Sequence, residues 1–316
     1  TKSTVSRYFN GGSIKEETRK KIQNVVEENN YIPNSFARLK AKESNTVGVI
    51  VPTLNSKVTS RVVTSVGRYL RSQGHGALIK DSDHSPKLEL ENINRLFTQK
   101  VDGILFSAIS LTEEHKQLLM NSLVPVVVLA QNFEEGITVT MDDYTAGKTM
   151  GSFMGSRVRG KIAYLGVEEE DEAVGIFRRQ GVLEGIKESG SQVMTVETGD
   201  YSYVSGQEMM EKVLEKGIPD GVICATDRLA FGAYRILQKH GILIPEQVSV
   251  AGFGGYDESE LLSPQLTTLR FDSYGLGYLG AETLLKMIRE EPVPKKQIVG
   301  FEMILGKSVR NENTVK

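Results

Sequence analysis

Residues 221–253 read GVICATDRLAFGAYRILQKHGILIPEQVSVAGF. A short apolar run, GVICATD, precedes a helical pattern near residues 228–240, and a second apolar run, VSVAGF, follows it. Strands that alternate with helices in this way form parallel sheets with helices on both faces. The stretch therefore predicts one strand–helix–strand unit of an α/β fold.

The same alternation runs through most of the chain from Thr46 onward. Short runs rich in β-branched residues are typical of strands buried in a parallel sheet. There are too many strands for one compact sheet, so we expect an α/β fold with two similar lobes. The other expected strands are TVGVIV (46–51), HGALIK (75–80), VDGILFSA (101–108), VPVVVLA (124–130), KIAYLGV (161–167) and QVMTVET (192–198), and the other expected helices lie near 60–74, 88–100, 143–157, 175–189 and 203–216.

The composition is compatible with two or three domains that have real cores, because the chain has 316 residues and 39% of them are hydrophobic. The single cysteine, Cys224, excludes a disulfide framework and favours a reducing compartment. No apolar run approaches the roughly 18 residues that a membrane span needs, and no signal peptide is visible. These features predict a cytoplasmic protein.

Charge is distributed unevenly along the chain. Residues 1–45 hold nine Lys or Arg and five Asp or Glu, a net charge of +4, whereas the remaining residues carry a net charge of −6. A small basic head on a larger acidic body favours a head that binds a polyanion. The alternative is an ordinary solvated helix face.

The basic head has the pattern of two short helices. Val5 and Phe9 are four residues apart and can share one apolar face, and the glycine pair that follows can end the first helix. Pro33 is expected to stop the second helix. Short hydroxyl and amide side chains on a basic surface can bind phosphate oxygens, so the head is a candidate DNA-binding element.

The head resembles the lactose/galactose repressor family, through TVSR at residues 4–7, Asn10, Thr18-Arg19 and NYIPN at residues 30–34. In that family a helix-turn-helix begins before this stretch, so the resemblance implies that the sequence starts at the recognition helix and that residues 1–316 alone bind DNA poorly. The alternative is a capped surface helix. By position, the resemblance implies base contacts from Lys2, Ser3 and Arg7, phosphate contacts from Thr4, Ser6, Asn10 and Asn34, and a hinge element containing Ala37 and Leu39. The family's hinge has one more residue between Arg38 and Leu39, and whether that residue is deleted or only missing from this sequence stays open.

The resemblance extends over the body and is closest at residues 220–253 and 263–272. It implies the fold of periplasmic sugar-binding proteins, with two lobes, a ligand cleft and three crossings near residues 140–143, 268–272 and 295–297. It also implies a homodimer whose interface includes the helices at 61–73 and 228–240. The implied domains are a partial headpiece (1–31), a hinge (32–45) and an effector-binding and dimerisation domain (46–316), with an N-terminal lobe at 46–140 and 271–294 and a C-terminal lobe at 143–268 and 297–310.

In open parallel sheets, ligands bind beyond the carboxyl ends of the strands. Arg178 occupies the family's Arg-x-x-Gly position, which implies that it grips effector oxygens. Asp227 lies in a matching polar-Asp pair, although it could instead be the N-cap of the helix at 228–240. The candidate effector-binding residues are Asn55, Ser56, Lys57, Arg61, Gln131, Arg178, Thr226, Asp227 and Gly254.

Two departures from the family pattern bear on the effector. Ala130 and Gly254 stand where the family often has aspartates, while Arg178, Lys57 and Arg61 remain. A desolvated cleft that keeps cations but loses anions favours an anionic ligand, because an unpaired buried charge is costly. GFGGYDESELLSPQLTT is most similar to the sucrose-operon repressors, which implies sucrose 6-phosphate as the effector; a neutral sugar is the alternative.

Two other classes of protein are considered. An enzyme with a dinucleotide loop is disfavoured because the GFGG motif is incomplete, with Asp257 at its sixth position. No cofactor or metal is expected, since the four histidines lack metal-ligand spacing. A sugar receptor or periplasmic carrier would have no use for the helix-turn-helix remnant. The sequence therefore predicts a sugar-responsive DNA-binding regulator, a repressor, and not an enzyme.

Overall fold

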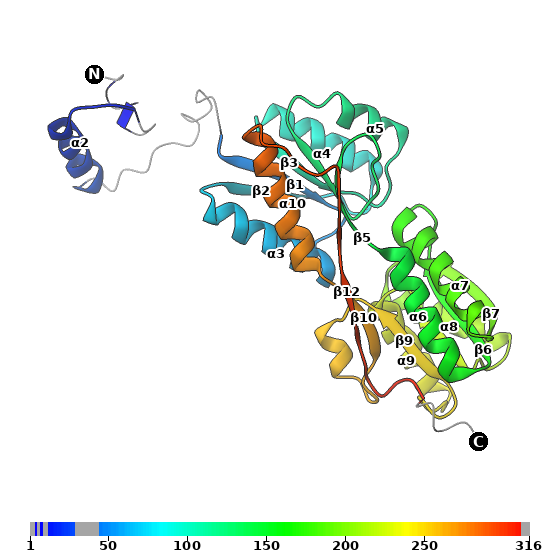
Figure 1. The fold of residues 1–316 in the computed structure, drawn as a ribbon. Helices are drawn as coiled ribbons and strands as arrows, with labels where there is room; N and C mark the ends of the chain where they lie inside the picture. The colour runs from blue at the N-terminus through cyan, green and yellow to red at the C-terminus, as the bar shows by residue number, and fades with distance from the viewer. Residues whose placement is uncertain (1–3, 5–6, 9–11, 29–43, 311–316) are drawn as a thin grey trace.

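The computed structural model describes residue 4 and residues 7–8, 12–28 and 44–310, and it places the body in two α/β lobes (Figure 1). Each lobe is built on a six-stranded sheet. The predicted two-lobed α/β fold is therefore confirmed.

The N-terminal lobe has the strand order β11-β5-β4-β3-β1-β2, with all strands parallel. Helices α3 and α10 pack on one face of the sheet, and α4 and α5 cover the other. The strands are β1 (Thr46–Val51), β2 (Gly76–Asp81), β3 (Gly103–Ser107), β4 (Val126–Leu129), β5 (Ile137–Met141) and β11 (Lys296–Val299), and the helices are α3 (Lys57–Ser72), α4 (Pro86–Thr98), α5 (Glu113–Met120) and α10 (Ser273–Ile288).

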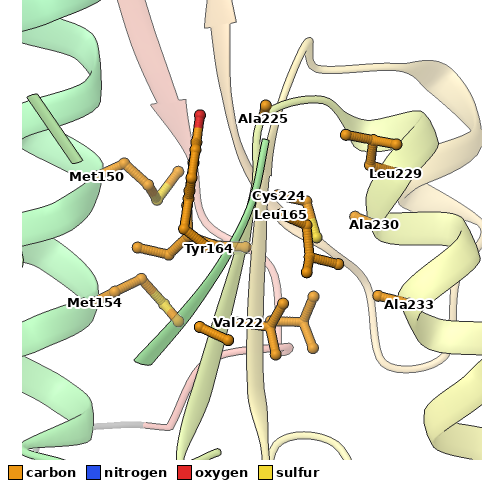
Figure 2. Packing of buried hydrophobic residues seen from close by; sticks show 14 of the residues in the cluster. Met150, Met154, Tyr164, Leu165, Val222, Cys224, Ala225, Leu229, Ala230 and Ala233 are labelled. Carbon is orange, nitrogen blue, oxygen red and sulfur yellow. The ribbon is translucent and has the colours of Figure 1, made fainter. Parts of the chain in front are cut away.

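The C-terminal lobe has the order β12-β10-β9-β8-β6-β7, in which only the β10–β12 pair is antiparallel. Helices α6 and α9 lie on opposite faces of this sheet, with the largest core cluster packed between (Figure 2). The strands are β6 (Lys161–Val167), β7 (Gln192–Gly199), β8 (Gly221–Cys224), β9 (Ser249–Phe253), β10 (Thr267–Phe271) and β12 (Phe301–Ile304), and the helices are α6 (Asp143–Val158), η2 (Glu172–Arg178, a π-helix), α7 (Arg179–Glu188), α8 (Tyr203–Glu215), α9 (Asp227–Lys239) and η3 (Asp257–Glu260, a 3₁₀-helix).

Burial follows the position of each strand in its sheet. In β1, a central strand, every residue after Thr46 is buried, as an all-apolar run flanked by helices on both faces requires. In β2, the edge strand beside it, exposed and partly buried residues alternate after the first two positions. The apolar runs of the sequence therefore mark the central strands most clearly.

The chain crosses between the lobes three times. The first crossing, at Asp142, joins β5 to α6, and the second, at Asp272, joins β10 to α10. The third lies at Gly300, because β11 pairs with β5 in the N-terminal lobe and β12 pairs with β10 in the C-terminal lobe. The predicted third crossing near residues 295–297 is wrong, and residues 297–299 belong to the N-terminal lobe.

Helices α6 and α7 pack at backbone distance because glycines line the contact. A Cβ atom added at Gly147 would lie 2.2 Å from the carbonyl oxygen of Arg178, and one at Gly151 would lie 2.2 Å from that of Val182. A Cβ at Gly181 on the opposing helix would lie 2.1 Å from the carbonyl oxygen of Tyr144. The close packing fixes the start of α7, and therefore Arg178, against α6.

The basic head contributes α2 (Glu16–Glu28), in which the amide of Arg19 donates to the carbonyl of Lys15. Thr4, Arg7 and Tyr8 are helical, and the Arg7 side chain is exposed. Nowhere in the described part of the chain is there a helix long and apolar enough to cross a membrane.

Candidate functional site

The centre of the candidate site is a buried ion pair between Arg178 and Asp143. Arg178 Nε and Nη2 donate to one carboxylate oxygen of Asp143, at 2.9 and 2.5 Å, and Arg178 Nη1 donates to the carbonyl of Ala225 at 2.7 Å. Arg178 ends η2 and Asp143 begins α6, so the two residues meet at the carboxyl edge of the C-terminal sheet. The guanidinium also lies over the rings of Phe253 and Phe271, at 5.0 and 5.2 Å from their centroids.

The protonation of this pair follows from burial and mutual attraction. Burial raises the pKa of Asp143, and the charge of Arg178 offsets part of that increase. Burial also acts to lower the pKa of Arg178, but the Asp143 carboxylate outweighs it and leaves the pKa above its ordinary value. Arg178 is therefore a fixed cation at the carboxyl edge of the C-terminal sheet.

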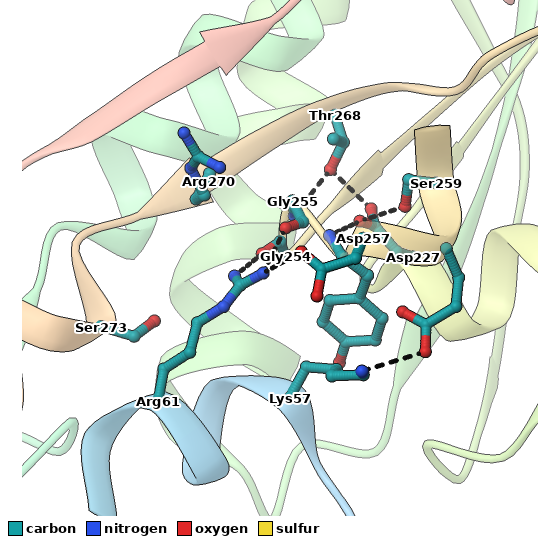
Figure 3. A network of polar contacts seen from close by, with 12 residues as sticks. Lys57, Arg61, Asp227, Gly254, Gly255, Asp257, Ser259, Thr268, Arg270 and Ser273 are labelled. Carbon is teal, nitrogen blue, oxygen red and sulfur yellow. Dashed lines mark hydrogen bonds and ion pairs between the residues drawn. The ribbon is translucent and has the colours of Figure 1, made fainter. Parts of the chain in front are cut away.

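Arg61 and Lys57, on the first helix of the N-terminal lobe, reach across to the C-terminal lobe (Figure 3). Arg61 Nη1 donates to the carbonyl of Gly254 at 3.0 Å, and Nη2 donates to that of Gly255 at 2.7 Å. Lys57 Nζ lies 3.1 Å from a carboxylate oxygen of Glu258. The predicted residues Lys57, Arg61 and Gly254 are thus brought together by direct contact between the lobes.

The glycine turn that receives Arg61 requires glycine at both positions. Gly254 and Gly255 have φ angles of +137° and +55°, a backbone region that favours glycine. A Cβ at Gly254 would lie 2.5 Å from the ring of Tyr256, and one at Gly255 would lie 2.6 Å from the Arg270 side chain. The two glycines therefore present carbonyl oxygens to Arg61.

Asp227 is fully buried, and both of its carboxylate oxygens accept hydrogen bonds from the protein. Its Oδ2 accepts from the Tyr256 amide at 2.9 Å and from the Ser259 hydroxyl at 2.8 Å, and its Oδ1 accepts from the Thr268 hydroxyl at 2.5 Å. The alternative in which Asp227 is the N-cap of α9 is wrong, because Thr226 caps this helix by accepting from the Leu229 amide. Asp227 instead holds the glycine turn and η3 in place.

The other predicted effector residues also take part in contacts of their own. Asn55 Oδ1 accepts from Arg228 of the C-terminal lobe at 3.3 Å, and Ser56 caps α3. Gln131 is buried, and its amide donates to Asp171 of the C-terminal lobe at 3.1 Å. The predicted residues therefore line the facing edges of the lobes, and several of them join one lobe to the other.

The expectation of cations without matching acids is wrong. Asp143 pairs with Arg178, Glu258 pairs with Lys57, and Asp257 lies 3.5 Å from Arg61. The family pattern at Ala130 and Gly254 does not reveal these acids, because each acid lies at a different position of the chain. Asp143 was recognisable only as a crossing residue, and no signal marked Asp171 or Tyr201, which also face the opposite lobe.

A cavity of about 480 Å³ lies at the other end of the N-terminal sheet, lined by residues that include Val101, Pro125 and Ile288. These residues precede β3 and β4 or end α10, so the cavity faces away from the cleft. Among the described residues, no group of three or more His, Cys, Asp or Glu could hold a metal ion.

Several predicted DNA-binding residues lie outside the described residues, namely Lys2, Ser3, Ser6, Asn10, Asn34, Ala37 and Leu39. Arg7 and Thr4 lie in helical backbone within the described part. The predicted base-reading Arg7 has the exposure that a DNA contact requires.

Comparison with known proteins identifies the family of this chain. The model for bacterial regulatory proteins of the lacI family matches residues 1–34, and the model for a periplasmic binding protein-like domain matches residues 157–309. Catabolite control protein A of Staphylococcus epidermidis is 31% identical over 307 residues, covering 94% of this chain and 92% of that protein. This chain belongs to the lacI family of bacterial regulatory proteins.

Other relatives of this LacI-family chain agree with the assignment. The sucrose operon repressor of Staphylococcus xylosus is 29% identical over 307 residues, covering 96% of this chain and 94% of the repressor. The Lac repressor dimer bound to operator and the anti-inducer ONPF superimposes with a TM-score of 0.87 at 23% identity, covering 97% of this chain and 94% of that one, a likeness of fold. The predicted resemblance is confirmed, and the chain is a bacterial regulatory protein of the lacI family.

Proposed function

We propose that this LacI-family protein represses a carbohydrate-utilisation operon and that a sugar or sugar phosphate in the interlobe cleft switches its affinity for the operator. The observation that carries the proposal is the buried Arg178–Asp143 pair at the carboxyl edge of the C-terminal sheet, the lobe that Lys57 and Arg61 of the other lobe contact. A guanidinium and a carboxylate held side by side can bind the hydroxyl groups of a sugar from both the donor and the acceptor side.

The switch works by differential binding. A ligand shifts the equilibrium between two lobe arrangements only as far as its affinity differs between them. Arg61, Lys57 and Asn55 contact the C-terminal lobe directly, so an effector that takes over these groups changes the spacing of the lobes. In a homodimer with α3 and α9 in its interface, that change would reach the headpieces.

The effector we propose is sucrose 6-phosphate. The relationship to a sucrose operon repressor supports this choice. The mouth of the cleft supports it too, because Arg61 has only 12% of its side chain exposed while its acidic partner Asp257 has 83% exposed. An exposed partner contributes little to an ion pair, so a phosphate can replace Asp257 at small cost.

Neutral sucrose is the second candidate, and Asp143 is the observation that favours it. Asp143 supplies a carboxylate beside Arg178, where a neutral sugar would need an acceptor for its hydroxyl protons. Calorimetric titration with sucrose 6-phosphate and sucrose distinguishes the two. Tighter binding of the phosphorylated sugar is the expected result, and equal or tighter binding of sucrose would transfer the proposal to the neutral effector.

Operator binding is tested separately from the effector. We place the protein in the cytoplasm, where Lys2, Ser3 and Arg7 would read bases and Thr4, Ser6, Asn10 and Asn34 would hold phosphates. Selection from a random duplex pool should enrich sites with two inverted half-sites, since a dimer presents two copies of the reading element. Recognition by this family uses a helix-turn-helix, so the selection should use protein that carries the whole of that element. A pool that shows no enrichment with this protein would contradict the DNA-binding role.

A further inference from the structure

Asp171 is a point where three elements meet. Its Oδ1 accepts from the Gln131 side-chain amide at 3.1 Å and from the Val174 backbone amide at 3.1 Å, and its Oδ2 accepts from the Tyr201 hydroxyl at 2.5 Å. Gln131 comes from the N-terminal lobe, whereas Val174 and Tyr201 belong to the C-terminal lobe. Oδ1 of the carboxylate therefore accepts from both lobes, and Oδ2 accepts from the C-terminal lobe alone.

Gln131 is held firmly on its own lobe. It follows β4, only 4% of the residue is exposed, and its Nε2 also donates to the carbonyl of Ile109 at 2.6 Å. A second contact reaches the same place, because the ring of His84 stacks on that of Tyr201 with centroids 6.0 Å apart. Two side chains of the N-terminal lobe thus meet the Asp171–Tyr201 pair.

Asp171 also begins the helix that ends at Arg178. It is the N-cap of η2, and its backbone carbonyl accepts from the Gly175 amide at 2.6 Å. A Cβ at Gly175 would lie 2.1 Å from the carbonyl oxygen of Glu168, so the preceding loop packs tightly on this turn. π-Helical turns are rare and occur frequently at functional sites. Asp171 and Arg178 are the two ends of one short rigid segment.

The Tyr201 hydroxyl keeps its proton in this arrangement. Burial raises its pKa well above the ordinary value, and the neighbouring charge of Asp171 raises it further. Tyr201 therefore keeps its proton near neutral pH and donates it to Asp171 in a hydrogen bond. The Asp171 carboxylate accepts hydrogen bonds from Gln131, Val174 and Tyr201. Of these three donors, only Gln131 belongs to the N-terminal lobe.

We propose that Asp171 is a positioning residue that couples lobe closure to Arg178. When the lobes approach, Gln131 binds Asp171, Asp171 fixes the start of the π-helix, and the π-helix holds Arg178 in its binding orientation. This inference rests on the proposed function, in that the effector binds in the cleft at Arg178. It adds a residue that does not touch the effector but sets its affinity.

The first test needs no effector. Amide hydrogen exchange of residues 172–178 is measured in the full chain, in Gln131→Ala, and in Glu170→Gln as a control at an exposed neighbour of Asp171. Losing one hydrogen bond of about 1.4 kcal/mol corresponds to a tenfold change. Exchange in this segment should therefore rise about tenfold in Gln131→Ala and stay unchanged in the control. Unchanged exchange in Gln131→Ala would overturn the coupling.

The second test uses sucrose 6-phosphate and sucrose in calorimetric titrations. Gln131→Ala and Asp171→Ala should each weaken binding about tenfold, the equivalent of one hydrogen bond, and the double variant should be no weaker than the worse single variant. Asp171→Asn keeps an N-cap oxygen and should recover most of the affinity. Additive losses would overturn the proposal, and Gln131→Ala decides it alone if Asp171→Ala does not fold.

The two ways of failing are distinguishable. If neither sugar binds the unmodified protein, the proposed effector is wrong, while the exchange measurement still decides the coupling of Gln131 to the π-helix. If a sugar binds and both single variants bind it equally well, the effector assignment survives and Asp171 has no positioning role.

Discussion

Arg178 carries its charge where little solvent reaches it, and Asp143 is the group that stabilises it there. The side chains of the pair are 8% and 6% exposed. Three donors of one guanidinium are used within the protein, on Asp143 and on the Ala225 carbonyl. Burying such a pair costs desolvation that good geometry repays only in part. The stability of the pair therefore depends on these contacts remaining intact.

Replacing Arg178 with Met leaves the Asp143 carboxylate buried without its cation. We expect the free energy of unfolding to fall by about 3–5 kcal/mol, the usual cost of an uncompensated buried charge. Urea denaturation followed by circular dichroism measures it. The double variant Arg178→Met, Asp143→Leu should regain much of the loss, because it removes both charges. A single variant as stable as the parent would show that the pair does not carry a buried charge.

Helices α6 and α7 show how an element positions a residue without touching the ligand. Glycines at 147, 151 and 181 let the two backbones meet, and α7 begins directly after Arg178. Any side chain in this contact forces the helices apart and moves the start of α7. The cost should therefore appear both in stability and in effector affinity.

Gly151→Ala tests this contact. The added methyl group would meet the carbonyl oxygen of Val182 at 2.2 Å, so we expect a destabilisation of about 1–3 kcal/mol from overpacking. Thr149→Ala is the matched control, on the same helix but exposed, and should change stability by no more than about 0.5 kcal/mol. Thermal unfolding of both variants gives the comparison. Equal stability of the two would contradict backbone-distance packing.

The sequence predicted the elements better than their assignment to sheets. The apolar runs at β1, β8 and β9 and the helices α6 and α9 follow from periodicity, because burial on both faces leaves a local pattern. The crossing at Gly300 does not follow from periodicity. The strands β11 and β12 have four residues each, and no local pattern says that they pair in different lobes.

The sequence predicted the site residues that directly follow a strand. It did not predict contacts between residues that are far apart along the chain. The sequence placed Lys57 and Arg61 just after the first strand, and the family resemblance placed Arg178 among the effector-binding residues. It could not place Asp257 and Glu258 opposite α3, because those contacts span about two hundred residues of chain. The burial of Asp227 was also unreadable, since its partners Ser259 and Thr268 lie more than thirty residues away.

At the scale of the whole molecule, the lobes are joined by side chains as well as by three crossings. Arg61, Lys57, Asn55 and Gln131 each contact the C-terminal lobe (Figure 3 shows the first two). These contacts join the two lobes directly. An effector bound between the lobes would compete with these contacts or add to them.

Arg61→Ala should shift the equilibrium toward parted lobes. It removes hydrogen bonds from a cation to two carbonyls, which together favour the joined arrangement by about 1.5–3 kcal/mol. Small-angle X-ray scattering should report a larger radius of gyration than for the parent. Arg71→Ala, an exposed arginine at the end of the same helix, should leave the radius unchanged. An unchanged radius of gyration in Arg61→Ala would contradict this prediction and show that the other contacts keep the lobes joined.

We propose that a sugar or sugar phosphate binds between the two lobes, and a thermal-shift titration measures this binding directly. The full chain is heated with sucrose 6-phosphate, sucrose and an unrelated sugar phosphate, each over a range of concentrations. A ligand at 100 times its dissociation constant should add about 2.7 kcal/mol of stability, and Arg178→Lys should abolish the shift. A saturable shift with sucrose 6-phosphate that exceeds the shift with sucrose is the expected result. No shift with any sugar, or a shift that Arg178→Lys retains in full, would contradict the account.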